Sequence, residues 1–233
     1  MKRLLFISTL LLLLVLTALA AFISVETFDS YSTSSDLLGA NGGSGWTGAW
    51  TAGGGGDWIV GTAPAGGQGG NAVKNVGVNA FEMIRGFTAI TSGTASWRAY
   101  LTITNPDDFM GVVLMEGATG KMFVRLGPAG NVEIYDSAIP AYVTVAAYSA
   151  STWVTIDIDF NAGTQPNLYR ARVNNGTYSG YKTVETGSYT NIDGIRLEST
   201  DTGVRDFWID DIKTPSAASS VVPILNSLRR RRP

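Results

Sequence analysis

The sequence predicts an all-β protein in which two antiparallel sheets form a β-sandwich of the jelly-roll type. Strand-like runs recur at short spacing between residues 71 and 213, and no part of this region has a helical period. Residues that favour turns separate the runs, as in Asn105-Pro106-Asp107 and Asn174-Asn175-Gly176. The runs are 71–76, 80–88, 95–104, 109–116, 120–126, 131–136, 141–147, 152–160, 168–174, 180–186, 193–199 and 204–213.

Two of these runs are expected to form a hairpin whose register follows from the sequence. Apolar residues take the even positions of 153–160 and the odd positions of 168–173. Residues opposite each other share one side of a sheet, so even positions must pair with odd ones. The register then pairs Phe160 with Tyr169, Asp159 with Arg170 and Asp157 with Arg172. The two Asp–Arg pairs are expected to be exposed ion pairs worth about 0.5 kcal/mol each, rather than an active site.

Residues 1–20 have the layout of a secretory signal and are predicted to form a signal helix. Lys2 and Arg3 supply the charged start, Leu4–Leu16 is mostly apolar, and Ala18-Leu19-Ala20 provides a small-x-small cleavage signature. The alternative is an uncleaved anchor, because the apolar character continues to Ile23 and such a length can span a bilayer. We expect cleavage after residue 20. The protein would then be secreted to the periplasm, the exterior or the cell surface, with no stable membrane span.

Residues 21–213 are expected to form one sandwich domain, followed by a linker and disordered tail at 214–233. Thr214–Ser220 is rich in Pro, Ser and Ala, and Arg229–Arg232 is a basic run. This ending resembles a bacterial sorting tail, but it lacks the span of about 20 apolar residues that such a tail carries. A disordered basic tail is therefore favoured.

Composition narrows the possible partners and chemistries. The termini hold six of the 17 basic residues (Lys2, Arg3 and the arginines 229–232), so 11 basic residues oppose 19 acidic ones elsewhere. A negative domain argues against nucleic acid as the partner and is compatible with calcium and neutral glycans. The absence of Cys leaves no disulfide framework. The absence of His rules out Ser-His and Cys-His catalysis and zinc sites built on His.

Aromatic residues on or near predicted loops are the candidates for stacking on a sugar ring. Three of them lie in the Gly-rich segment Gly39–Gly70, which is expected to be a wrapped surface loop. The candidate ligand-binding residues are Trp46, Trp50, Trp58, Tyr178 and Tyr181. The alternative for each tryptophan is burial in the sandwich, where its ring removes a large apolar area from water.

Carboxylates mark both ends of the predicted domain. Glu26 and Asp29 lie on or just after the expected first strand, while Asp210 and Asp211 lie in the last strand. If these strands meet, the carboxylates and nearby carbonyl groups could supply some of the six to eight oxygen atoms that calcium prefers. Asp210 and Asp211 would point to opposite faces of a regular strand, so both could bind one ion only where the strand is interrupted. The alternative is an acidic strand end that faces solvent.

Several segments resemble the concanavalin A-like (laminin-G-type) jelly-roll domains of secreted bacterial proteins. They are Glu26–Tyr31, Leu38–Trp50, Met110–Gly117, Lys121–Val124, Trp153–Phe160 and Phe207–Ile212. The resemblance covers nearly the whole chain from the leader to Lys213. It implies a two-sheet sandwich, a carbohydrate-binding or adhesive role and a structural calcium ion near the first and last strands.

The resemblance also raises the possibility of a glycoside hydrolase, because glucanases share this fold. Laminarinase-like relatives carry their catalytic acids on one strand as Glu-x-Asp-x-x-Glu, a run that this sequence lacks. Carboxylates brought together from distant strands remain open. The residues therefore favour a noncatalytic, lectin-like module that binds a polysaccharide or a cell-surface glycan. A structural or adhesive envelope protein without a small ligand is the main alternative.

Overall fold

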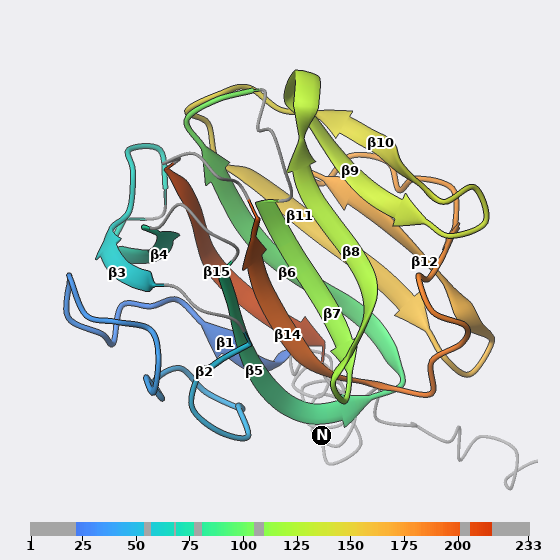
Figure 1. Cartoon of the computed structure of the whole chain (residues 1–233), viewed down its shortest axis with the longest axis horizontal. Coiled ribbons are helices and arrows are strands. Elements are labelled where there is room, and N and C mark those ends of the chain that lie inside the picture. Colours follow the sequence, from blue (N-terminus) through green and yellow to red (C-terminus); the bar gives the residue numbers. More distant parts are fainter. Residues whose placement is uncertain are drawn as a thin grey trace, which may run out of the picture.

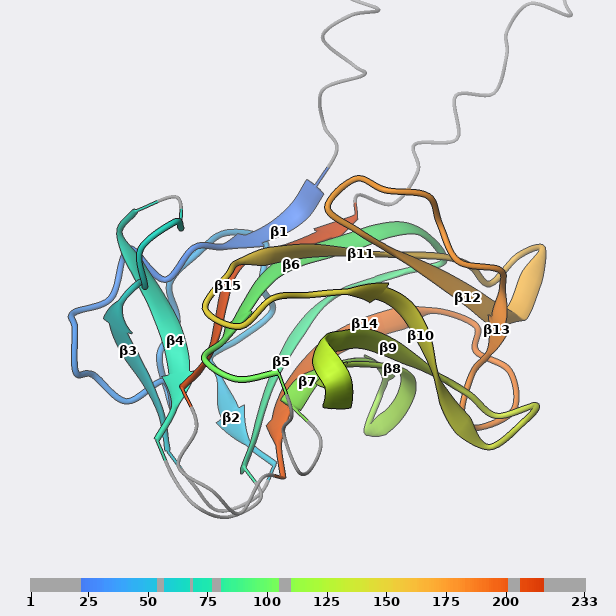
Figure 2. The same cartoon turned by 90° about the horizontal axis from the view of Figure 1, so that it is seen from above.

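The computed structural model describes residues 22–53, 57–67, 69–76, 81–104, 110–200 and 206–215. Within these residues the regular structure is β-strand apart from one short 3-10 turn, η1 (Pro128–Gly130). The strands form two antiparallel sheets that pack face to face (Figures 1 and 2). The expected signal helix and residues 216–233 of the expected tail lie outside the described part of the chain. In that part, no helix has the length and hydropathy needed to cross a membrane.

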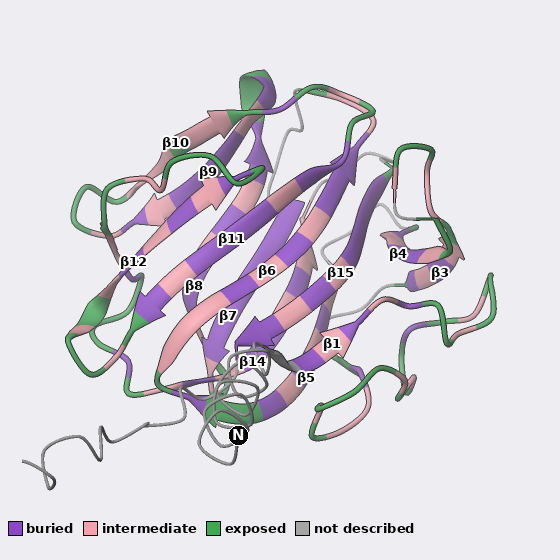
Figure 3. Ribbon diagram, turned by 180° about the vertical axis from the view of Figure 1, so that it is seen from behind, coloured by how far each residue is buried: buried purple, intermediate pink, exposed green. Residues whose placement is uncertain are grey.

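Sheet A, seen face-on in Figure 3, has the order β13-β12-β11-β6-β15-β4-β3, with β1 also paired to β15. Its strands are β1 (Phe22–Glu26), β3 (Trp58–Thr62), β4 (Asn71–Asn75), β6 (Ser92–Leu101), β11 (Val154–Asn161), β12 (Gln165–Val173), β13 (Lys182–Thr183) and β15 (Phe207–Pro215). Sheet B faces the viewer in Figure 1 and has the order β10-β9-β8-β7-β14-β5-β2. Its strands are β2 (Thr51–Ala52), β5 (Phe81–Ile90), β7 (Met110–Glu116), β8 (Thr119–Gly127), β9 (Asn131–Asp136), β10 (Ala141–Ala147) and β14 (Ile192–Ser199).

The predicted hairpin register is confirmed in β11 and β12. Phe160 lies opposite Tyr169, and each aspartate lies opposite its expected arginine: Asp159 opposite Arg170 and Asp157 opposite Arg172. Their Nε–Oδ2 distances are 2.8 Å for Arg170–Asp159 and 2.7 Å for Arg172–Asp157. The alternation of apolar and polar residues was sufficient to set this register, because a slip by one residue would turn the apolar side chains outward.

Several strand boundaries differ from the prediction, and two of these differences change the architecture. The Gly-rich segment Gly39–Gly70 was expected to be a loop, but it contains β2 and β3. These strands are short and lie at sheet edges, so they carry little of the alternation that identifies a strand. The last strand extends to Pro215, two residues into the expected linker, because β1 pairs with it up to Phe22 opposite Pro215. The first and last strands therefore meet, as expected.

The space between the sheets is filled by one apolar core. Alternate residues of each strand point into it, which gives the striped pattern of burial in Figure 3. Trp97 is 1% exposed there, as expected for its position. The hydroxyl group of Tyr169 crosses the core from β12 and donates to the carbonyl oxygens of Tyr135 (2.5 Å) and Phe123 (3.3 Å) in sheet B. This side chain ties the two sheets together without leaving a buried hydroxyl unpaired.

A buried ion pair anchors residues 27–50, here called the N-terminal wrap, to sheet B. Arg85 of β5 points inward and meets Glu26 of β1, with an Nη1–Oε2 distance of 2.5 Å and both side chains 1% exposed. Every guanidinium nitrogen donates a hydrogen bond. The acceptors are Glu26, the hydroxyl of Tyr31, the side-chain oxygen of Asn41 and the carbonyl oxygens of Gly42 and Gly48.

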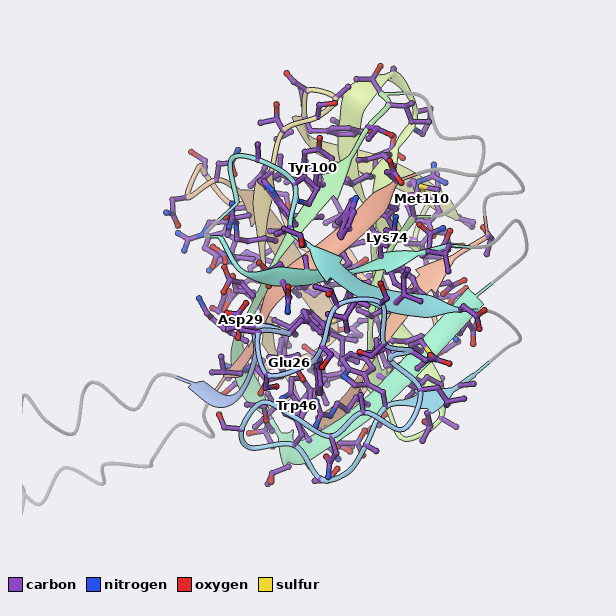
Figure 4. The ribbon with its side chains drawn as sticks, turned by 90° about the vertical axis from the view of Figure 1, so that its left-hand side faces the viewer. Glu26, Asp29, Trp46, Lys74, Tyr100 and Met110 are labelled. Carbon is purple, nitrogen blue, oxygen red and sulfur yellow. The ribbon has the colours of Figure 1, made fainter. Side chains whose placement is uncertain are left out.

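The wrap also covers Arg85 with aromatic rings. The guanidinium carbon lies 4.8 Å from the ring centre of Trp46 and 5.6 Å from that of Trp50. Gly43 allows the wrap to pass close to β1, because a side chain there would place Cβ 2.5 Å from the carbonyl oxygen of Val25. The sequence block Gly39–Trp50 therefore packs around Arg85. Figure 4 shows Glu26 and Trp46 in this part of the molecule.

Replacing Arg85 by Met should destabilise the fold by about 3–5 kcal/mol, because it leaves Glu26 as a buried charge without its partner. Denaturant unfolding of the protein would measure this loss. Arg170→Met is the matched control, since it breaks an exposed pair and should cost less than about 1 kcal/mol. Equal losses in the two variants would contradict the anchoring role of Arg85.

Candidate functional site

A row of side chains crosses six strands on the outer face of sheet B, and it is here called the aromatic row because its members on β8, β9 and β10 are aromatic. Along this row the cross-strand pairs are Ile84 with Arg196, Arg196 with Val113 and Val113 with Phe123, and the row continues through Tyr135 to Tyr142. The rings of Phe123 and Tyr135 lie 6.4 Å apart, and those of Tyr135 and Tyr142 lie 5.3 Å apart, both edge to face. These side chains point away from the core, and Phe123 and Tyr142 pack with Ile84 against a separate small apolar cluster of Val113 and Met115.

A second row, here called the charged row, runs parallel to the aromatic row and is offset from it by two residues along each strand. Its members, in order across the sheet, are Glu82, Glu198, Gly111, Arg125, Glu133 and Thr144. Gly111 has no side chain, so the row is interrupted at the central strand β7. Arg125 contacts Glu133 at 2.8 Å, and its guanidinium carbon lies 3.7 Å from the ring centre of Tyr142. The ion pair lies within the charged row, and the cation–π contact with Tyr142 joins that row to the aromatic row.

Two glutamates face each other across β5 and β14, bridged by one arginine. Arg196 approaches Glu82 at 3.4 Å and Glu198 at 2.7 Å. Burial raises the pKa of Glu198, and the neighbouring carboxylate of Glu82 also raises it, while Arg196 opposes both effects. Among the described residues, the Nε group of Arg196 is buried without a hydrogen-bond acceptor. The side chains of this face therefore hold polar groups that their protein neighbours satisfy only in part.

The three tryptophans expected to stack on a ligand lie elsewhere, in or under the N-terminal wrap. Trp50 and Trp58 are 1% and 0% exposed. Trp46 is half-buried, donates its Nε1–H to the carbonyl oxygen of Val25 and has Arg85 over its ring. Trp50 and Trp58 are buried in the sandwich, which is the alternative that the sequence left open. Neither presents a ring to a ligand in this structure, which corrects the expectation for these two.

Tyr178 and Tyr181 lie at the surface of sheet A, close to β12. The guanidinium carbon of Arg170 is 4.5 Å from the ring centre of Tyr178 and 4.9 Å from that of Tyr181. Tyr181 is 41% exposed. Both tyrosines are therefore available to a ligand, but not to the same ligand as the rows on sheet B.

The carboxylates of the first and last strands are only partly brought together. Asp211 has a positive φ of 52°, and the pairing of β15 with β6 shifts register after Asp210, so the strand is interrupted by a bulge here. Asp210 is 2% exposed, and one of its oxygens accepts the N–H of Asp211 at 2.7 Å. Asp211 lies 3.7 Å from Arg98. The bulge removes the strict alternation that would have kept the two residues on opposite faces.

Asp210 is an acidic group in an unfavourable environment. Its pKa is raised to about 7, first by burial and then by the carboxylates of Asp211 and Asp29, while Arg98 and the hydrogen bond from Asp211 lower it. Asp29 is exposed and accepts the N–H of Asn71 at 2.7 Å. No group of three potential metal ligands is found among the residues that the structure describes.

Glu26 is not available as a ligand of the same ion. One of its oxygens accepts the N–H of Phe28 at 3.0 Å, and the other accepts from Tyr31 and Arg85. A second cation at this carboxylate would have to displace Arg85 from its buried position. Glu26 is therefore removed from the four candidate metal ligands, and Asp29, Asp210 and Asp211 do not form a group of three ligands in the part of the chain that the structure describes.

The rows on sheet B were not anticipated as a site. Their members lie in runs that the sequence analysis assigned to strands, where every second side chain points away from the core. The alternation of Val132 and Ile134 with Glu133 and Tyr135 is visible in the sequence. The hairpin of β9 and β10 places Tyr135 beside Tyr142, but the order of the strands across the sheet, which the sequence does not show, places Glu82 beside Glu198.

No protein-family model matches this chain, and no curated protein matches its sequence. Solved structures are nevertheless similar. A sialidase has a TM-score of 0.52 and 11% identity, over 86% of this chain and 19% of the sialidase chain. The cellulose-induced protein Cip1 has a TM-score of 0.51 and 17% identity, over 74% of this chain and 91% of Cip1.

A third similar structure comes from work on endo-acting O-glycanases that members of the human gut microbiota express to initiate mucin breakdown. It has a TM-score of 0.51 and 11% identity, over 84% of this chain and 99% of that chain. Identities this low establish the fold alone. The chain has the concanavalin A-like jelly-roll fold.

Proposed function

We propose that this protein is an exported, noncatalytic glycan-binding module whose binding surface is the outer face of sheet B. The observation that carries this proposal is the aromatic row beside the charged row. Aromatic rings offer apolar faces to the C–H groups of a sugar ring, while carboxylates and guanidinium groups hydrogen-bond its hydroxyl groups. Ligand sites commonly combine apolar contact area with a few polar groups that fix orientation.

The charges on this face favour a neutral glycan. Each of its three cationic side chains lies within ion-pair distance of a carboxylate: Arg125 of Glu133, Arg196 of Glu82 and Glu198, and Lys121 of Glu116. These three cationic side chains are only 9–20% exposed, so an acidic sugar could reach them only by displacing their carboxylate partners. Neutral hydroxyl groups can instead be added to the existing network.

We propose further that calcium binds beside the bulge of β15, held by Asp210 and Asp29 with Asp211 nearby. Support comes from the buried carboxylate of Asp210, whose pKa is raised by burial and by the charges of Asp211 and Asp29. Calcium prefers oxygen ligands and would neutralise this charge. The ion would stabilise the junction of the first and last strands, and it has no part in the glycan contact.

A glycoside hydrolase is the second candidate, because Glu82 and Glu198 face each other and the pKa of Glu198 is raised. Directly opposite residues lie close enough for the carboxyl separation of about 5 Å that retaining enzymes use. The shared Arg196 argues against this role, since it stabilises the charged form of both groups. If the protein released reducing ends from a polysaccharide, and if Glu198→Gln abolished that release, the protein would be a glycoside hydrolase rather than a noncatalytic module.

Tyr135→Ala should weaken binding to a neutral polysaccharide at least about tenfold, which corresponds to about 1.4 kcal/mol, because it removes the middle ring of the aromatic row. Affinity electrophoresis through gels that contain β-glucan, xylan or mannan would measure this change. Tyr181→Ala on sheet A is the matched control and should leave retardation unchanged. No retardation of the wild-type protein by any neutral polysaccharide would favour a structural or adhesive envelope protein instead.

Calcium should raise the melting temperature of the wild-type protein at pH 7.5 relative to chelator, and the increase should be absent in Asp210→Asn. The folded-state pKa of Asp210, about 7, lies above its unfolded value. The free energy of unfolding in chelator should therefore fall as the pH rises from about 4 to about 7, by about 2–4 kcal/mol.

Differential scanning calorimetry with and without calcium would test this prediction. Asp159→Asn, which alters a half-buried acidic residue away from the bulge, is the control and should respond to calcium like the wild type. A calcium-induced increase that persists in Asp210→Asn would contradict the proposed site.

A further inference from the structure

Sheet A carries a second polar surface, formed by Arg170, Arg172, Tyr178 and Tyr181 and here called the Arg–Tyr ladder. The two arginines are alternate residues of β12, so they lie on one face of the sheet about 7 Å apart along the strand. Figure 3 looks onto this face, with β12 beside β11. The ladder thus lies on the opposite side of the sandwich from the rows on sheet B.

Backbone pairing holds the two tyrosines against the arginines. Ser179 forms hydrogen bonds with both backbone polar groups of Ala171. The N–H of Ser179 donates to the carbonyl oxygen of Ala171 at 2.7 Å, and the hydroxyl of Ser179 accepts from the N–H of Ala171 at 3.1 Å. Tyr178 and Tyr181, on either side of Ser179, are thereby placed over the arginine side chains. Tyr178 contacts both, with its ring centre 4.5 Å and 4.7 Å from the two guanidinium carbons.

Each guanidinium of the ladder is held from one side and open on the other. Only the Nε group of each arginine donates to its aspartate, Asp159 or Asp157. Among the described residues, no other hydrogen bond from these two side chains is found. The Nη groups therefore keep their N–H donors for a ligand, and the arginine side chains are 34% and 31% exposed.

Another part of this face is covered. Further along sheet A, Tyr100, Trp153 and Trp208 form a cluster in which each residue is at most 9% exposed. The segment 63–67 lies over it, because its carbonyl groups accept from the Trp153 indole at 3.1 Å and from Arg98 at 3.2 Å. The aromatic cluster of sheet A is therefore shielded from solvent, whereas the two guanidinium groups of the ladder remain accessible to a ligand.

From this geometry we propose that the Arg–Tyr ladder binds carboxylate groups of an acidic polysaccharide, as a second site distinct from the rows on sheet B. A guanidinium matches a carboxylate with two parallel hydrogen bonds, and stacking fixes its orientation before the ligand arrives. Two such groups on one strand suit a chain that carries a carboxylate on successive sugars. The aspartates balance the charge of the arginines, so recognition depends on directed hydrogen bonds rather than on a strongly positive surface.

The test compares three gels, containing polygalacturonate, dextran sulfate or a neutral β-glucan, for the whole protein. The double variant Arg170→Lys/Arg172→Lys keeps the charges but loses the forked donors. It should bind polygalacturonate at least tenfold more weakly, with unchanged retardation in β-glucan and an unchanged melting temperature. Tyr135→Ala should show the reverse pattern, so failure of one site is distinguishable from failure of the other.

Three results would overturn the proposal. They are no retardation of the wild type by polygalacturonate, equal retardation of the double-lysine variant, and retardation by dextran sulfate at least as strong as by polygalacturonate. The last result would mean that the ladder responds to negative charge in general rather than to carboxylate geometry. A loss of polygalacturonate binding in Tyr181→Ala, with β-glucan binding retained, would support the role of the stacked rings.

Discussion

The ion pair between Arg85 and Glu26 is the interaction on which the N-terminal part of this fold depends. It joins β1 to β5, on opposite sheets, at a point where both side chains are almost fully buried. A buried charge that loses its partner is costly, so the wrap must close around Arg85 for the domain to be stable. Because β1 also pairs with β15, the same contact helps to fix the last strand, beside which the acidic cluster of Asp210 lies. With no Cys in the chain, packing and such polar anchors replace disulfides.

Alternation along the strands gives the sandwich two outer faces with different chemistry. On sheet B, aromatic rings and mutually paired charges lie side by side, which suits neutral sugars. On sheet A, the indole rings are covered by a loop, and the open part presents two guanidinium groups held by aspartates and tyrosines. Both faces are built on rigid strands.

Much of the fold could be predicted from the sequence, because alternation and turn residues are local signals. The register of β11 and β12 followed from the positions of a few apolar residues and is confirmed by the Asp–Arg pairs. The site was harder to predict. From the sequence, Trp50 and Trp58 could be either ligand contacts or core residues. The tertiary structure shows that both are buried in the core. The positive φ of Asp211, which alters the strand near Asp210, has no signal in the sequence. The rows on sheet B depend on strand order, which joins residues far apart in the chain and is set by tertiary packing.

The central claim is that the outer face of sheet B binds a neutral glycan. The most direct test is to map backbone amide chemical shifts by NMR while a neutral oligosaccharide is added to the isotope-labelled protein. The account predicts that the largest changes lie on β8, β9, β10 and β14, centred on Tyr135 and Glu198, with little change in β12. Changes centred on the N-terminal wrap around Trp46, or on the Arg–Tyr ladder, would contradict it.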